Sequence, residues 1–335
     1  MKSRLVDRWC GVICLCLAAN VISEVSAADK LIGFHSARTM SQAMPWIAEE
    51  AGLFKKYELD FQLVYISSAP IVTAALLGGD AQVAISGGEA IVRAHAQGAT
   101  DLVFVGSAKN TLTHSILGKP EIKRPEDLKG RKLGLTRLGS NSHYFIIQVL
   151  RKYGMEPTDI NFIQTGGQVE NLAALMSGNV DAATMTGPSG GTRALAQGFR
   201  HVVYGPDMHI PFVAAAVITR RSILQTRAPA IDKFVRATAE AMKIMFLDKE
   251  FTYKVLGKQL RINDRKVLDA AYDEEIKVLE RRLEFKNEAF QAIIDETAKV
   301  DARAKKIKPQ DLVDRRFLDS LNKSGFFDKL WAGRS

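Results

Sequence analysis

The sequence predicts an α/β protein in which two βαβαβ units follow one another and a mainly helical region completes the chain. The first observation is an internal repeat: ALLGGDAQVAISGG at residues 75–88 returns in altered form as ALMSGNVDAATMTG at residues 174–187. The second is that each copy closes a series of alternating strand and helix patterns. Strands that alternate with helices form parallel sheets with right-handed crossovers, so we expect two sheets of similar construction.

The first unit begins at Lys30 and contains three strands and two helices. Short apolar runs between polar turns predict the strands, at residues 30–34, 59–66 and 81–86. Apolar residues at helical spacing predict the helices, at residues 43–54 and 67–79. Gly52 is expected to end the first helix, while Ser68 is the expected N-cap of the second and Pro70 lies in its first turn.

The second unit repeats this order from Lys132 onward. Its predicted strands are at residues 132–136, 160–165 and 181–186, and its predicted helices are at residues 143–155 and 169–178. The interval from Lys30 to Gly52 equals the interval from Lys132 to Gly154. The repeat therefore extends over both units and is not confined to the two stretches that resemble each other in letters.

Residues 229–331 show apolar residues at three- and four-residue spacing and no repeat, so we expect packing helices without a catalytic constellation. Two connecting stretches cross between the units. They predict a discontinuous lobe I, a lobe II and a cleft between them. The boundaries are residues 30–114 plus 215–335 for lobe I and 115–214 for lobe II, with hinges near Leu117, Gly118 and 210–214.

Residues 1–27 have the pattern of a secretory signal peptide: a short basic lead, an apolar core and small residues at a cleavage site near Ala27. A membrane anchor is the alternative, but the apolar run is shorter than the roughly 20 residues that a spanning helix needs. Cys10, Cys14 and Cys16 all lie in this segment, so the mature chain has no disulfide and no cysteine metal site. We expect a free protein exported to the periplasm.

The formal net charge is +9, but the basic residues are dispersed among acidic ones, which does not indicate a nucleic-acid partner. The six histidines form no i, i+4 pair and no HExxH motif, so no metal site is predicted. The sequence has no Walker A motif and no GxGxxG motif. We therefore expect neither a metal nor a cofactor.

The expected ligand site lies beyond the carboxyl ends of the strands, where loops enter helices. Helix N-termini carry a partial positive charge and free N–H groups, which favour an anionic or strongly polar ligand. Arg38 adds a guanidinium suited to carboxylate, sulfonate or phosphate. Helix capping is the alternative for each loop taken alone. The candidate ligand-binding residues are Ser36, Arg38, Thr39, Met40, Ser68, Ser86, Gly87, Asn110, Thr111, Ser140, Asn141, Thr186, Gly187 and Pro188.

The stretch GPSGG at residues 187–191 also allows an enzymatic interpretation, because it fits the nucleophile-elbow pattern GxSxG after a strand. Asp207 and His209 follow Ser189 in the order found in serine hydrolases. Their two-residue spacing makes it difficult for acid and base to meet as a triad requires, and no HGGG-like stretch precedes them. The internal repeat also pairs Gly187 with Gly88, so a binding turn is the favoured interpretation.

Several stretches in order resemble a known family, the substrate-binding proteins of the nitrate/sulfonate/taurine type, with the related NMT1-like, thiamine-pyrimidine sequences. The likeness lies in PWIAEEAGLFKKYELDFQLVYI, ALLGGDAQVAISGG, IKRPEDLKGRKLGLTRLGSNSHY, NLAALMSGNVDAATMTGP and KPQDLVDRRFLDSLNKSGFFD, and it covers nearly all of residues 30–328. The resemblance implies a two-lobed periplasmic-binding-protein fold. It also implies that the protein delivers a small molecule to an ABC permease.

The resemblance places the family's ligand loops on the candidate residues above but leaves the ligand open among sulfonates, carboxylates, pyrimidines and oxoanions. Because these loops offer mainly hydroxyls, amides and backbone, we favour a small organic molecule with an anionic group. One branch of the family makes pyrimidines and carries a cysteine-rich iron motif. This chain has no cysteine after Cys16, so it departs from that branch. We expect a monomer that is not an enzyme.

Overall fold

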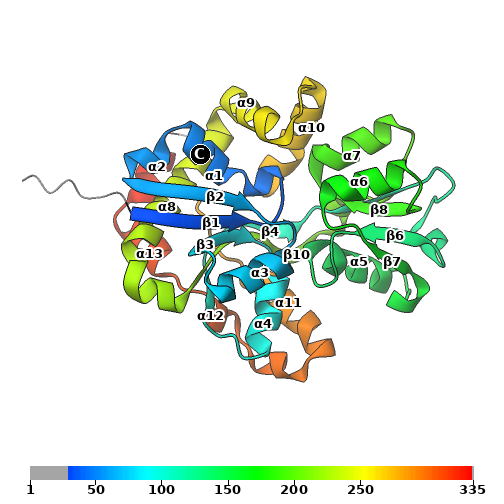
Figure 1. The fold of residues 1–335 in the computed structure, drawn as a ribbon, viewed down its shortest axis with the longest axis horizontal. Coiled ribbons are helices and arrows are strands. Elements are labelled where there is room, and N and C mark those ends of the chain that lie inside the picture. The colour runs from blue at the N-terminus through cyan, green and yellow to red at the C-terminus, as the bar shows by residue number, and fades with distance from the viewer. Residues whose placement is uncertain (1–28, 334–335) are drawn as a thin grey trace, which may run out of the picture.

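The computed structural model describes residues 29–333, without the side chains of Ala271 and of residues 187–190. The stretch interpreted as a signal peptide lies outside the described residues. The described chain forms two five-stranded sheets that lie side by side, with helices on both faces of each (Figure 1). Over the described range, no helix is long and apolar enough to cross a membrane.

The first sheet has the strand order β2-β1-β3-β10-β4. β1 pairs in parallel with β2 and β3, whereas β10 pairs antiparallel with β3 and β4. Its strands are β1 Asp29–His35, β2 Leu59–Tyr65, β3 Val83–Ser86, β4 Leu102–Leu112 and β10 Ile210–Arg220. The helices between them are α1 Met44–Glu50, α2 Leu53–Lys56, α3 Ala69–Gly78 and α4 Glu89–Ala96.

The second sheet repeats this plan in the order β7-β6-β8-β5-β9. β6 pairs in parallel with β7 and β8, and β5 pairs antiparallel with β8 and β9. Its strands are β5 Ser115–Gly118, β6 Lys132–Leu135, β7 Asn161–Gln164, β8 Ala182–Met185 and β9 Arg200–Val203. Its helices are α5 Asn141–Lys152, α6 Gln168–Met176 and α7 Gly187–Ala196. The prediction of a two-lobed α/β fold built from two similar units is therefore confirmed.

The expected first helix is divided in two, because Gly52 adopts a left-handed backbone with φ of 69°. α1 ends at Glu50, and α2 begins directly after the glycine. A left-handed residue cannot continue an α-helix and is cheapest for glycine. The turn redirects the chain into β2, at the edge of the first sheet.

The chain passes between the sheets twice. Thr113 and His114 join β4 to β5, and residues 204–209 join β9 to β10. Leu117 and Gly118, expected near a hinge, lie inside β5, where they pair with Ala183 and Ala182. The first crossing is therefore slightly earlier in the chain than the sequence indicated.

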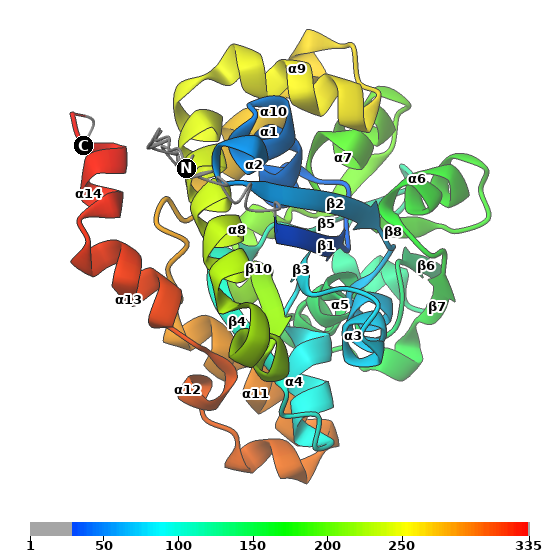
Figure 2. The same cartoon turned by 60° about the vertical axis from the view of Figure 1, so that its left-hand side comes forward.

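The rest of the chain is helical, as predicted, and most of it packs on the first sheet. Its helices are α8 Arg221–Leu247, α9 Lys249–Leu260, α10 Arg265–Glu275, α11 Asn287–Val300, α12 Pro309–Leu312, α13 Arg316–Lys323 and α14 Phe326–Trp331. α8 packs on α1 and shares one hydrophobic core with it (Figure 2). A second core lies on the other face of the sheet and includes residues of α4, α5 and α11.

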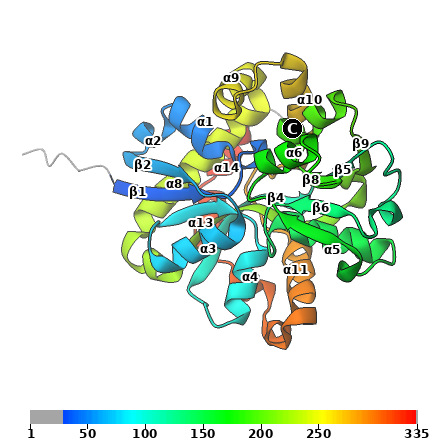
Figure 3. The same ribbon diagram turned by 45° about the vertical axis from the view of Figure 1, so that its right-hand side comes forward.

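α10 differs from this pattern because it contacts α7, which belongs to the second sheet (Figure 1). Figure 3 shows α10 beside the helices of that second sheet. α10 also contacts the short turn Met40–Gln42 in the first loop of the chain. The C-terminal helices are therefore not confined to packing on the first sheet. α10 spans the gap between the two lobes.

Candidate functional site

A small buried cavity of about 60 Å³ lies between the two sheets. A volume of this size holds a few water molecules or a small ligand. Loops that follow β1, β2, β6, β7 and β8 contribute to its wall, which is the place predicted from the carboxyl ends of parallel strands. The predicted residues that line it are Ser36, Thr39, Ser68, Ser140, Asn141 and Thr186.

Four helix N-caps meet at this cavity. They are Ser68 for α3, Ser140 for α5, Gly167 for α6 and Thr186 for α7, and all four line the wall. Each N-terminus presents N–H groups that the helix itself does not use, together with a partial positive charge. Helices from both lobes therefore favour a negatively charged or strongly polar group at the same place.

Two of these N-caps keep their hydroxyl groups free of the helix. The side chains of Ser68 and Thr186 accept no capping hydrogen bond, and their hydroxyl oxygens are buried without a partner among the described residues. Ser68 also has a φ of 83°, an unfavourable value for a residue other than glycine. Strained backbone and unsatisfied buried hydroxyls together indicate positions organised for a ligand rather than for helix capping alone.

Gln42 shapes the first loop of the site, although the sequence analysis did not select it. Its Oε1 accepts hydrogen bonds from the backbone N–H groups of Ser36 and Ala37, both at 3.0 Å. Its Nε2 donates to the Ser36 hydroxyl at 3.1 Å. Gln42 is almost fully buried, so these bonds hold the loop after β1 against the cavity.

Three hydroxyl groups hold the corresponding loop of the second lobe. Thr136, Ser140 and Ser142 lie within 2.8 Å of one another, oxygen to oxygen. The Ser140 hydroxyl also donates to the carbonyl of Arg137 at 2.6 Å. This loop begins α5, and its hydroxyls are satisfied among themselves. The network fixes the N-terminus of α5 beside the cavity.

The two lobes touch each other at the rim of the cavity. Asn141 of α5 donates from Nδ2 to the carbonyl of Ala214 at 3.1 Å. A Cβ atom placed on Gly87 would lie 1.9 Å from Asn141 Oδ1, so only glycine allows this approach. The Ser67 hydroxyl donates to the carbonyl of Gly166 across the same gap. The structure is therefore that of a closed arrangement of the lobes.

A buried ion pair forms another part of the wall. Lys109 Nζ lies 2.6 Å from Glu275 Oε1, and each side chain is only 4% exposed. Thr113 joins the pair: Lys109 Nζ donates to its hydroxyl at 2.6 Å, and that hydroxyl donates to Glu275 Oε1 at 2.7 Å. Lys109 belongs to β4, whereas Glu275 is the last residue of α10. The C-terminal helices thus supply a charged side chain to the site.

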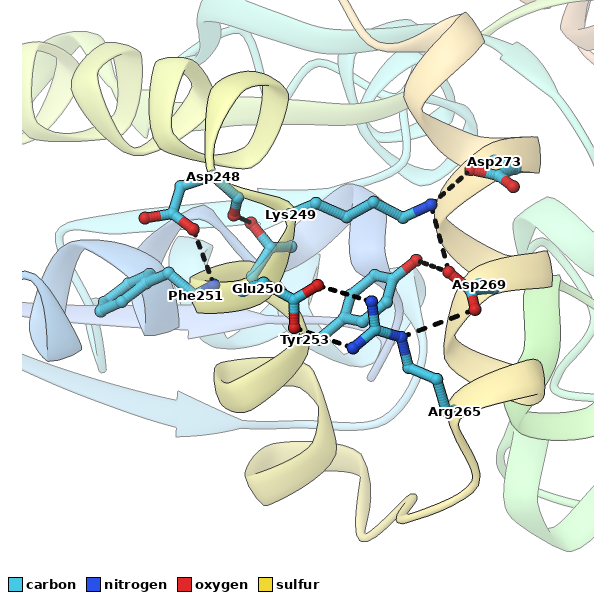
Figure 4. A network of polar contacts seen from close by, with 9 residues as sticks. Asp248, Lys249, Glu250, Phe251, Tyr253, Arg265, Asp269 and Asp273 are labelled. Atoms are coloured by element: carbon cyan, nitrogen blue, oxygen red, sulfur yellow. Dashed lines mark hydrogen bonds and ion pairs between the residues drawn. The ribbon is translucent and has the colours of Figure 1, made fainter.

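α10 is held in place by polar contacts with α9 (Figure 4). Lys249 Nζ lies 3.1 Å from both Asp269 and Asp273, and the Tyr253 hydroxyl donates to Asp269 at 2.5 Å. Arg265 donates from its two terminal guanidinium nitrogens, Nη1 and Nη2, to the two carboxylate oxygens of Glu250, at 2.8 and 2.5 Å. Exposed pairs contribute little individually, but a network of this density restricts the orientation of a short helix.

The histidines near the site are neutral. Burial, together with the nearby charge of Lys109, lowers the pKa of His114, which lines the cavity, to about 3. Burial likewise lowers the pKa of His35 to about 4, against a hydrogen bond to the Ala37 carbonyl. Neither imidazole therefore supplies positive charge to a ligand at neutral pH.

Several predicted residues lie away from the cavity wall. Arg38 stacks over Tyr65, with its guanidinium carbon 4.6 Å from the ring centre, and Met40 is buried in the core of the first lobe. Asn110 accepts from the Ser107 hydroxyl and donates to the carbonyl of Glu284, so it fixes the segment after α10 instead of facing a ligand.

The remaining predicted residues are distributed around the site. Thr111 donates to the carbonyl of Ile210 at the second crossing. Ser86 is fully buried, with its hydroxyl unpartnered in the described structure, and Gly87 packs against Asn141. Gly187 and Pro188 begin α7, but their side-chain environment lies outside the described residues.

Sequence reasoning missed a group of lining residues that have no repeat or motif around them. The signal for Lys109 was present, since it is a lone charge within the apolar strand LVFVGSAKNTL. Glu275 gave no such signal, because it stands among other acidic residues on an amphipathic helix. The missed lining residues include Ser41, Gln42, Tyr65, Lys109, Thr113, Thr136, Ala214 and Glu275.

The residues proposed with GPSGG do not form the catalytic triad of a serine hydrolase. Asp207 and His209 are both exposed on the second crossing, and neither lines the cavity. A triad needs a buried acid that orients the base. The Ser189 side chain itself lies outside the described residues. Within residues 29–333, no cluster of three or more His, Cys, Asp or Glu residues has metal-site geometry.

Paired sheets of matching strand order, with a polar cavity enclosed between them, define the class of the two-lobed periplasmic binding proteins. The sequence confirms this assignment. The sequence profile of the NMT1/THI5-like family matches residues 41–250, more than half of the chain, and the protein belongs to that family.

Individual relatives are distant. A binding protein of Brucella abortus is 24% identical over 259 residues, which are 75% of this chain and 78% of that protein. The taurine-binding periplasmic protein of Escherichia coli K12 is 25% identical over 122 residues, or 36% of this chain and 38% of that protein. The curated relatives named here are therefore binding proteins.

Solved structures share the fold. The periplasmic aliphatic sulphonate binding protein SsuA of Escherichia coli superposes with a TM-score of 0.67 at 23% identity, covering 86% of this chain and 92% of SsuA. The desulfurization enzyme DSZB superposes with a TM-score of 0.66 at 14% identity, covering 88% of this chain and 99% of the enzyme. The same fold thus occurs both in binding proteins and in an enzyme.

Proposed function

We propose that this protein is an extracytoplasmic solute-binding protein that captures a small organic anion between its lobes and delivers it to an ABC permease. The observation that carries the proposal is the meeting of four helix N-caps, from both lobes, at one buried cavity. The unpartnered hydroxyls of Ser68 and Thr186 support it. A buried polar group without a partner costs about 1–3 kcal/mol, and ligand oxygens would remove that cost.

Capture proceeds by rotation of lobe II, residues 115–214, onto lobe I, residues 30–114 plus 215–335. The ligand binds the open form and stabilises the closed form, which the permease recognises. Two contacts support this closing motion. Asn141 of α5 binds Ala214, which is the last residue of the expected lobe II but lies in β10 of the first sheet. Ser67 of lobe I binds Gly166 of lobe II. The protein acts as a monomer in the periplasm after cleavage near Ala27.

Sulfonates are the first ligand class to test, followed by carboxylates, pyrimidines and inorganic oxoanions. Two observations support a small ligand recognised by hydroxyl, amide and backbone groups: the cavity is small, and no arginine is among the residues that line it in the described structure. The names of the taurine- and sulphonate-binding relatives favour the sulfonates.

Thermal unfolding of the purified protein with a panel of these compounds tests the proposal. A ligand at about 100 times its Kd adds roughly 2.7 kcal/mol to the free energy of unfolding, which raises Tm by a few degrees for a chain of this size. Ser68→Ala and Thr186→Val should each reduce the shift, whereas Ser177→Ala, on the exposed end of α6, should not. An unchanged shift in both site variants would contradict the assignment of the cavity.

The same panel separates binding from catalysis. A binding protein returns each compound unchanged, so chromatography after long incubation should recover all of it. If no compound raises Tm but the protein hydrolyses a generic ester, and Ser189→Ala abolishes that hydrolysis, the enzymatic interpretation replaces the one proposed.

A further inference from the structure

The charges in the cavity wall balance each other. Among the lining residues that the structure describes, only Lys109 and Glu275 carry formal charges, and they are paired with each other. His114 is neutral at physiological pH because burial lowers its pKa to about 3. Placing a charge in a buried site is costly unless an opposite charge compensates it. The helix N-termini compensate one anionic group in part, and the side chains add no net positive charge.

Glu275 retains one carboxylate oxygen for another partner. Its Oε1 accepts from both Lys109 and Thr113, at 2.6 and 2.7 Å. Its Oε2 is buried and has no hydrogen-bond partner among the described residues. A carboxylate buried to this degree normally has both oxygens satisfied, because an unpaired charged acceptor costs more than a neutral one. A hydrogen-bond donor on the ligand would satisfy the Oε2 atom of Glu275.

We propose that the ligand is a small zwitterion, whose anionic group binds at the helix N-termini and whose ammonium group donates to Glu275 Oε2. This inference rests on the proposed function and narrows its ligand class. A zwitterion adds no net charge to a wall that is itself neutral. It also satisfies both kinds of unpartnered group in the structure: hydroxyls at the N-caps and a carboxylate oxygen on α10. The C-terminal helical region thus selects the ligand's second group.

Isothermal titration calorimetry with matched compounds tests the proposal in the unmodified protein. The probes are 2-aminoethanesulfonate against propane-1-sulfonate, and 3-aminopropanoate against butanoate. In each pair the ammonium replaces a methyl group at equal length. A hydrogen bond to a charged group contributes about 1.5–3 kcal/mol, so the amino compound should bind roughly 10- to 150-fold more tightly. Equal or tighter binding of the alkyl compound overturns the proposal.

Glu275→Gln should remove this preference. It leaves Lys109 without its counterion and makes the wall positive, so propane-1-sulfonate should bind more tightly than it does to the unmodified protein. A preference that persists in Glu275→Gln overturns the role of this residue. If that variant does not fold, the double variant Lys109→Met with Glu275→Gln removes both charges together, and it should bind the two members of each pair about equally.

The outcomes also separate this inference from the proposed function. If no member of either pair binds but another compound of the larger panel does, the zwitterion is wrong and the solute-binding function stands. If no compound of the panel binds at all, the proposed function fails as well.

Discussion

Gly87→Ala should prevent the closed arrangement of the lobes without disturbing either lobe alone. The added Cβ would lie 1.9 Å from Asn141 Oδ1, and the three atoms nearest to it all belong to the Asn141 side chain. Gly87 follows β3 of the first lobe, whereas Asn141 begins α5 of the second. In the open form the two residues separate, so the alanine should meet no obstacle there.

The expected loss of binding free energy can be worked out from the interactions that the Asn141 side chain loses when it moves. To make room, its amide has to leave the carbonyl of Ala214, which it binds at 3.1 Å. Loss of that hydrogen bond costs about 0.5–1.5 kcal/mol, and an unfavourable rotamer costs a similar amount. The total of roughly 1–3 kcal/mol corresponds to a fall in affinity of about 5- to 150-fold.

A double-mutant cycle measured by calorimetry checks this reasoning, using the panel compound that gives the largest Tm shift. Asn141→Ala removes the obstacle, so Gly87→Ala should cost much less in that background than in the unmodified protein. The Tm of ligand-free Gly87→Ala should stay near that of the unmodified protein. If the two losses of affinity add, or if ligand-free Gly87→Ala unfolds early, the clash with Asn141 is not the cause.

Three further predictions concern buried and paired charges. Lys109→Met should lower the free energy of unfolding by about 3–5 kcal/mol in urea titrations, because it leaves Glu275 buried and unpaired. Removing both charges with Glu275→Gln should recover part of that loss. The pKa of His114 is about 3 in the folded protein, against an ordinary value of 6.5, so between these two pH values the unfolded state binds one more proton than the folded state. The free energy of unfolding should therefore decrease as the pH is lowered from 6.5 to about 3. In His114→Asn, the slope of the free energy of unfolding against pH should be smaller in this range by an amount equivalent to about one bound proton. Arg151→Ala should destabilise the closed form by up to about 1 kcal/mol, because Arg151 of α5 binds Glu296 of α11 at 2.7 and 2.9 Å on a half-exposed surface. Binding of the panel ligand should weaken accordingly, with no change at α11 in hydrogen exchange of the open form.

The two sheets could be predicted from the sequence because their signal is local and duplicated. Each strand is a short apolar run, each helix has its own cap or stop, and the second unit repeats the first. The loops at the carboxyl ends followed from that order, which is why Ser68, Ser140, Asn141 and Thr186 lie at the cavity as expected. Arg38 lay in a predicted loop as well, but its side chain stacks on Tyr65 outside the wall.

The charged part of the site could not be predicted, because it depends on contacts between segments far apart in the chain. Lys109 and Glu275 are separated by 166 positions. Nothing in the sequence of α10 indicates that its last turn enters a cleft formed by the two repeats. Asn110 shows the opposite case: it was among the predicted ligand-binding residues, but its side chain anchors the segment that follows α10.

A binding protein must both attract its ligand and distinguish it from similar molecules, and the position of α10 suggests that different parts of this chain do these two things. On the function proposed above, the duplicated halves attract the ligand's polar head group through the N-termini of α3, α5, α6 and α7. On the proposal made above, the ligand's other end is recognised by α10, a helix outside the duplication that is held to its neighbour α9 by side chains on the protein surface. If Glu275 binds the ligand's ammonium group as proposed, substitutions at the end of α10 should change the preferred ligand while the helix N-termini of the two repeats stay unchanged.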